Sequence, residues 1–180
     1  MSKLALLTLV PALLGLIGAS GLLFYPGVVR AWLHRFPRDI WSGRVLSAIA
    51  IAWAAWIMRD MPFGRFEAMK PMLFPIAILL GVLVWFAMDE LLAPRALGAL
   101  LLLYPAPLLA AARIHPSRWS VVMSVVAYIM IVKGISLMLS PYLLRVVTER
   151  ALRGKASCNV IGAAGLLVSV AMLLLAFLVY

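Results

Sequence analysis

Long apolar runs, separated by short basic stretches, restrict the fold of this chain more than any other feature. Six of these runs approach the roughly 20 apolar residues that a helix needs to cross a membrane. They cover residues 4–25, 40–58, 71–88, 96–112, 119–140 and 158–179. Hydrocarbon offers no water to backbone N–H and C=O groups, so such runs must bond these groups internally, as helices do. The sequence predicts an all-α fold, a polytopic integral membrane helix bundle of about six transmembrane helices, with residues 1–180 as a single transmembrane domain.

The charged residues are few and lie mostly between the apolar runs. Hydrophobic residues make up 66% of the chain, against roughly 45 to 50% in a soluble domain. A charge at the bilayer centre costs about 2.5 to 3.5 kcal/mol, which explains the segregation. The net charge is +10, but no stretch between the runs is long enough to form a nucleic-acid-binding domain. We therefore expect no nucleic-acid partner, and we expect the basic residues to contact anionic membrane lipids.

Lysine and arginine divide unequally between the two sides of a six-helix arrangement. Six lie on one side, namely Lys3, Arg59, Arg65, Lys70, Arg113 and Arg118. Nine lie on the other, namely Arg30, Arg35, Arg38, Arg44, Arg95, Arg145, Arg150, Arg153 and Lys155. Cytoplasmic loops carry the excess of basic residues, so the first, third and fifth loops should be cytoplasmic and both termini outside. We expect the membrane to be a bacterial inner (cytoplasmic) membrane.

An internal repeat is predicted at an offset of 115 positions. Four pairs align without a gap, namely Pro26 with Pro141, Arg30 with Arg145, Arg35 with Arg150 and Arg38 with Arg153. A first hairpin (4–58) would then correspond in parallel to a second (119–179), with a central helix pair (71–112) between them. Coincidence and shared interfacial chemistry are the alternative. A weaker resemblance of residues 25–41 to 104–119 would instead give an inverted arrangement.

The two basic turns are the first candidate binding site. Several guanidinium groups beside a membrane can bind phosphate oxygens through paired hydrogen bonds, and lipid headgroups are the natural ligand. The candidate residues are Arg30, Arg35, Arg38, Arg145, Arg150 and Arg153. Residues 26–44 are long enough for a short interfacial helix that turns Arg30, Arg35 and Arg38 to water. The alternative is that these arginines only set topology and anchor the chain nonspecifically.

A second candidate is an intramembrane polar site formed by Lys133, Asp89 and Glu90. Lys133 lies within the fifth apolar run, where a cation must reach the interface, pair with an acid or line a polar cavity. The adjacent acids Asp89 and Glu90 follow the third run and are its expected partners. A salt bridge in the loop, with nearby Arg95, is the simpler interpretation of these acids.

The sequence lacks a convergent catalytic or metal-binding set. It has one cysteine, two histidines and six acids, and no spacing among them is typical of a metal or haem site. His34 and Asp39 have the H-x4-D spacing that glycerolipid acyltransferases use, but no further part of such an enzyme is present. We therefore expect no enzyme activity, no cofactor and no metal.

Two functions fit these features. We favour a non-catalytic accessory or structural subunit that packs in a larger membrane complex, or self-associates, and contacts anionic lipid through its basic turns. The alternative is a small transporter or channel, for a lipid or amphipathic cargo, to which the proline-interrupted fourth run (Pro105 and Pro107) could contribute. A transporter should have a polar mid-membrane cavity that includes Lys133. A packing subunit should have a dry core and a broad apolar face.

Overall fold

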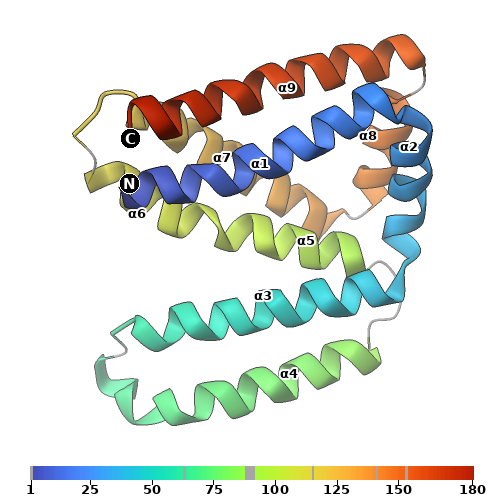
Figure 1. Cartoon of the computed structure of the whole chain (residues 1–180). Helices are drawn as coiled ribbons and strands as arrows, with labels where there is room; N and C mark the ends of the chain where they lie inside the picture. The colour runs from blue at the N-terminus through green and yellow to red at the C-terminus, as the bar shows by residue number, and fades with distance from the viewer. Residues whose placement is uncertain (1, 63, 88–91, 115, 141, 153) are drawn as a thin grey trace.

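The computed structural model describes residues 2–62, 64–87, 92–114, 116–140, 142–152 and 154–180, and every regular element in this part of the chain is helical (Figure 1). Six described helices are long and apolar enough to cross a membrane, which confirms the predicted fold class. The spans are built from α1 (Lys3–Phe24), α3 (Ile40–Asp60), η2 (Gly64–Met72) with α4 (Leu73–Ala87), α5 (Leu92–Leu103) with α6 (Pro105–Ile114), α7 (Ser120–Leu139) and α9 (Lys155–Leu178). Three short helices complete the turns, namely α2 (Pro26–Arg35), η1 (Phe36–Arg38) and α8 (Tyr142–Ala151).

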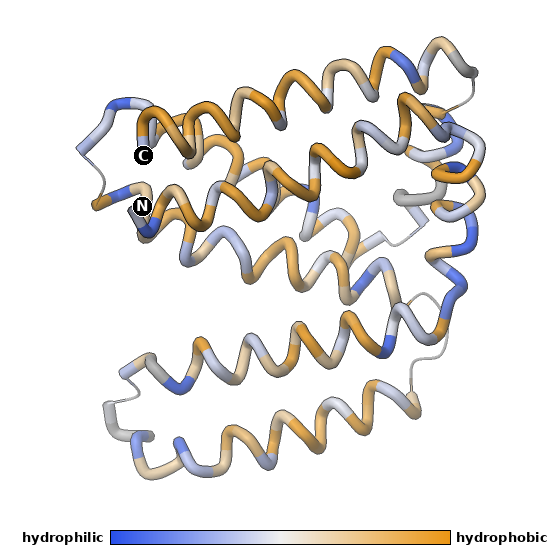
Figure 2. Tube along the Cα trace, in the orientation of Figure 1, coloured by the Kyte–Doolittle hydropathy of each residue, from blue (hydrophilic) through white to orange (hydrophobic). Residues whose placement is uncertain are grey.

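The helices pack in an order that the sequence does not follow. The first and last helices, α1 and α9, form the most extensive contact of the bundle, and α5 lies between α3 and α7. The helix α4 stands at the edge, against α3 (Figure 1). Both termini lie at one end of the bundle, and both basic turns, α2 and α8, lie at the other, where they contact each other. Figure 2 shows the hydrophobic colour along the helices and hydrophilic residues gathered at their ends.

Small residues allow the closest helix crossings. A Cβ atom added to Gly98 of α5 would lie 2.9 Å from the carbonyl oxygen of Gly134 on α7, and the reverse distance is also 2.9 Å. In the α1–α9 contact, a Cβ atom on Gly162 would lie 2.9 Å from Cγ of Leu23. Van der Waals packing holds membrane helices together, and small side chains let the backbones approach. The glycines therefore fix two crossings within the chain.

The predicted break in the fourth span lies at Tyr104, between α5 and α6. Pro105 begins α6 because proline cannot donate a backbone hydrogen bond and is accepted in the first turn of a helix. The Tyr104 side chain, 9% exposed, donates a hydrogen bond to the carbonyl oxygen of Leu7 on α1. Its ring meets that of Trp53 on α3 edge-on, with 5.9 Å between centroids. The break thus joins three spans rather than opening a polar path.

Two predicted details were wrong. The fourth span begins at Leu92 rather than at residue 96, so Arg95 belongs to the first turn of α5. The interfacial helix α2 exists, but Arg30 is partly buried and its guanidinium does not point straight into water. Its Nη2 atom lies 3.3 Å from the buried sulfur of Cys158 on α9, because α2 packs over the bundle end and turns this position inward.

The predicted duplication is matched by element bounds but not by packing. An offset of 115 carries Phe24, the last residue of α1, onto Leu139, the last residue of α7, and Ile40 of α3 onto Lys155 of α9. The weaker resemblance, of residues 25–41 to 104–119, matches the bounds of α2 with those of α6. Because the offset matches α1 with α7 and α3 with α9, the counterpart of the α1–α9 contact would be a contact between α7 and α3. Helix α5 separates α3 from α7, so these two helices have no contact of similar extent. The duplication stays a prediction.

Candidate functional site

The first basic turn is built from strong local signals. Pro26 begins α2 at a position where its missing N–H is not needed. The carboxylate of Asp39 caps α3 by accepting hydrogen bonds from the Ser42 backbone N–H, at 3.2 Å, and from the Ser42 hydroxyl. The hydrogen bond from the Ser42 side chain is the main reason that the pKa of Asp39 is lowered. Pro26 at the start of α2 and the Asp39 cap at the start of α3 therefore fix the two ends of the turn.

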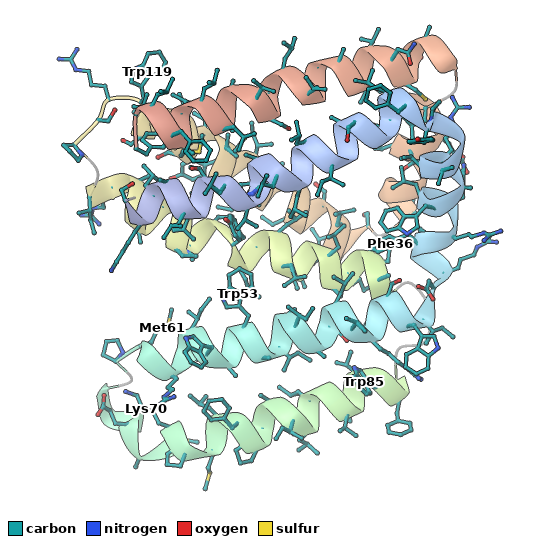
Figure 3. All side chains as sticks on the ribbon, viewed as in Figure 1. Phe36, Trp53, Met61, Lys70, Trp85 and Trp119 are labelled. Atoms are coloured by element: carbon teal, nitrogen blue, oxygen red, sulfur yellow. The ribbon has the colours of Figure 1, made fainter. Side chains whose placement is uncertain are left out.

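Trp32, Phe36 and Pro37 form one wall of the turn. Phe36 in η1 is 7% exposed, and its ring lies against that of Trp32 with 5.1 Å between centroids. Pro37 is also buried. Figure 3 shows Phe36 at the end of the bundle where α2 and α8 meet. The wall is therefore part of the folded core and not a loose loop.

Two hollows meet at this wall. The first, of about 590 Å³ and called the polar hollow from here on, has charged as well as aromatic side chains in its lining, namely Trp32, His34, Arg35, Phe36, Arg38, Asp39 and Ser42. The second, of about 350 Å³, is almost entirely apolar and is lined by Trp32, Leu33, Phe36, Ser42, Val45, Leu46 and Leu97. They share Trp32, Phe36 and Ser42. The turn thus places a hollow with charged side chains directly beside an apolar groove.

The arginines of the first turn have different surroundings. Arg35 and Arg38 are exposed and line the polar hollow, and within the described part of the chain neither forms an ion pair. Arg30 points to Cys158 and its buried Nε atom has no hydrogen-bond partner among the described residues. The structure therefore brings two of the three predicted arginines together at a surface hollow.

The second basic turn is described only in part. Arg150 is exposed on α8, and Arg145 lies in the same helix, although its side chain is outside the described part of the structure. Arg153 lies outside the described residues altogether. The predicted phosphate contacts of this turn therefore stay predictions.

Lys133 faces outward from α7. Its side chain is exposed, whereas Met123, Ala127 and Gly134 form the buried face of that helix. Leu139, the C-terminal end of α7, lies six positions further along the helix, which is about 9 Å at 1.5 Å per residue, so the ammonium can reach the interface. Asp89 and Glu90 lie outside the described residues, so their predicted pairing with Lys133 stays a prediction.

His34 and Asp39 both line the polar hollow. The hydrogen bonds of the Asp39 carboxylate go to Ser42, and none to His34 is present within the described part of the chain. Among the described residues, three or more histidine, cysteine or acidic side chains nowhere form a group that could hold a metal ion. The arrangement suits binding of an anion more than activation of a nucleophile.

A groove between α3 and α4 was not predicted. It has a volume of about 410 Å³ and an apolar lining. Small side chains form much of it, namely Ala48, Ala52 and Ala55 on α3 and Ala77 and Gly81 on α4. Trp85 of α4 donates a hydrogen bond of 3.3 Å to Ser47 of α3 at one end (Figure 3). The four-residue spacing of small residues was the available sequence signal.

Comparison of the chain with protein-family models, with curated proteins and with solved structures found no match.

Proposed function

We propose that this integral membrane protein is a non-catalytic accessory or structural subunit that packs against other subunits of a larger membrane complex. The observation that carries the proposal is the exposure of α4. This helix forms most of the span Glu67–Ala87, and no side chain in the most apolar part of that span is buried. Its extensive helix contact is with α3 alone. Small residues normally line filled helix interfaces, but Ala52, Ala77 and Gly81 here line an open groove. A helix from another subunit would complete this interface.

The core supports a packing role over transport. The buried polar side chains of the described chain include Thr8, Ser47 and Ser169. Each donates a hydrogen bond to a carbonyl of its own helix, at 2.8, 2.9 and 2.8 Å, so the O–H donor of each hydroxyl is already used within the protein. Lys133, which a transporter would need in a cavity, is exposed. Transport of a lipid or amphipathic cargo is therefore the weaker alternative.

The two ends of the bundle support a membrane orientation. Both basic turns lie at the end opposite the termini, as the unequal division of lysine and arginine predicts. We propose that this end faces the cytoplasm of a bacterial inner membrane and contacts anionic lipid there.

Photo-crosslinking in the native membrane tests the partner. A crosslinking amino acid in place of Ile78 or Leu83, both exposed on α4, should capture one or a few proteins reproducibly. The same amino acid in place of Val132, exposed on α7, should capture far less. Purification in mild detergent should give those proteins in fixed stoichiometry.

Filling the groove sharpens the test. Ala52→Trp places an indole in the α3–α4 groove and should abolish co-purification, whereas Ala164→Trp, on an exposed position of α9, should not. Thermal unfolding in detergent checks that both variants fold. A chain that purifies alone from mild detergent, with no α4-specific crosslink, would contradict the proposal.

A further inference from the structure

We propose that the first basic turn binds one anionic glycerophospholipid, with its phosphate between Arg35 and Arg38 and one acyl chain in the adjoining apolar groove, which Leu97 helps to line. The site deepens the lipid contact of the proposed function, and it rests on that function only for the placement of the turn at a membrane surface. Nothing in it requires a partner subunit.

The polar hollow has the charge to hold a phosphate. Arg35 and Arg38 supply two positive charges and no ion pair occupies them within the described part of the chain. Among the described residues, the hollow has the carboxylate of Asp39 in its lining, and this group already accepts two hydrogen bonds from Ser42. The charged side chains of the described residues that line the hollow, Arg35, Arg38 and Asp39, therefore sum to a positive value at neutral pH. Guanidinium groups bind phosphate oxygens in pairs of parallel hydrogen bonds, so two of them suit a single phosphate.

The adjoining groove has the chemistry of an acyl chain. Leu33, Val45, Leu46 and Leu97 line it, and they come from α2, α3 and α5. The groove shares Trp32 and Phe36 with the polar hollow, so the charged head and the apolar tail of one molecule can lie on adjoining surfaces. Tryptophan is favoured at this depth because its ring is apolar and its N–H is polar.

A phospholipid fits better than the other amphipathic or anionic candidates. A free phosphate would leave the apolar groove empty, and a neutral lipid would leave two guanidinium groups without an anion. The wall is fixed, because Phe36 and Pro37 are buried and η1 contacts α5. A fixed site should therefore keep its lipid through purification, whereas the mobile lipids around any membrane protein exchange.

Native mass spectrometry of the full chain in mild detergent, titrated with phosphatidylglycerol, tests the site. The double variant Arg35→Gln/Arg38→Gln should weaken binding of the first lipid by at least about tenfold, because two charge-assisted hydrogen-bonding groups are lost. The matched control is Arg113→Gln/Arg118→Gln, which removes two exposed arginines at the opposite end and should leave that binding unchanged.

The acyl groove is tested separately. Leu97→Trp fills it and Val45→Asn, at a half-exposed position, makes it polar without crowding the core. Both should weaken binding of phosphatidylglycerol severalfold, and inorganic phosphate at millimolar concentration should not displace the lipid. Thermal unfolding verifies that each variant is folded.

Three results that concern the headgroup would overturn the site. They are unchanged binding in the Arg35/Arg38 variant, an equal loss in the Arg113/Arg118 control, and displacement by inorganic phosphate alone. Unchanged binding in both groove variants would likewise overturn it, by reducing the contact to the headgroup. Because the assay uses the isolated chain, a missing partner subunit would refute the proposed function and leave this result standing.

Discussion

Replacing Tyr104 by phenylalanine should destabilise the bundle, and the size of the loss should depend on a proline in a different helix. Pro11 lies inside α1 and has no N–H, so the carbonyl oxygen of Leu7, four residues earlier, lacks its normal helical donor. The hydroxyl of Tyr104 donates to that oxygen. The interhelical hydrogen bond therefore replaces the intrahelical bond that the proline removes.

The expected loss follows from the surroundings of the pair. Tyr104 is almost fully buried, and leaving a buried acceptor unpaired costs about 1–3 kcal/mol in soluble proteins. Interhelical hydrogen bonds measured in a membrane protein average about 0.6 kcal/mol and reach about 1.7. Because no intrahelical donor competes for this carbonyl, we expect Tyr104→Phe to cost about 1 to 1.5 kcal/mol, near the upper end of that range. The ring and its contact with Trp53 are kept.

Pro11→Ala supplies the missing N–H and tests the reasoning directly. In that background the Leu7 carbonyl has a helical donor, so Tyr104→Phe should cost only a few tenths of a kcal/mol, giving a coupling energy of about 1 kcal/mol in the double-mutant cycle. Reversible unfolding in mixed detergent and SDS micelles, followed by circular dichroism, measures the four free energies. An equal loss in both backgrounds would refute the argument that the hydroxyl compensates for Pro11.

Three further outcomes are expected. Gly98→Leu should destabilise the chain by about 1–3 kcal/mol or more in the same unfolding assay, because its Cβ atom would lie 2.9 Å from a backbone oxygen of α7, whereas Gly18→Leu, with nothing within 4 Å, should have little effect. The Asp39 carboxyl should titrate below 3.8, since its pKa is lowered in the folded chain. The stability that this cap contributes is therefore present above pH 3.8 and lost as the pH falls through the lowered folded pKa. An NMR titration measures that pKa, and Asp39→Asn should remove the pH dependence. A topology reporter fused after Tyr180 should lie outside the cytoplasm, and a cytoplasmic signal would contradict the orientation.

Part of the candidate site could be predicted from the sequence. Arg35 ends a proline-initiated interfacial helix and Arg38 lies three positions beyond it, and the exposure of both agrees with the pattern of charged and apolar residues. Arg30 belongs to the same pattern, yet its guanidinium points to Cys158, more than a hundred positions away. No local pattern predicts that contact, because it depends on which helices the tertiary fold brings together at this end of the bundle.

The sequence by itself determined that the chain is a six-span helical membrane protein with its basic turns at one end. The physical reason is that hydrocarbon forces each apolar run to bond its own backbone groups, so length and hydropathy decide each helix locally. Only the tertiary structure decided which helices touch. It placed α1 against α9 and α5 between α3 and α7, joined Leu97 to the basic turn, and left the groove between α3 and α4 open. Which helices pack together depends on close contacts of small residues between helices that are distant in sequence. A sequence made mostly of similar apolar residues gives little indication of those contacts.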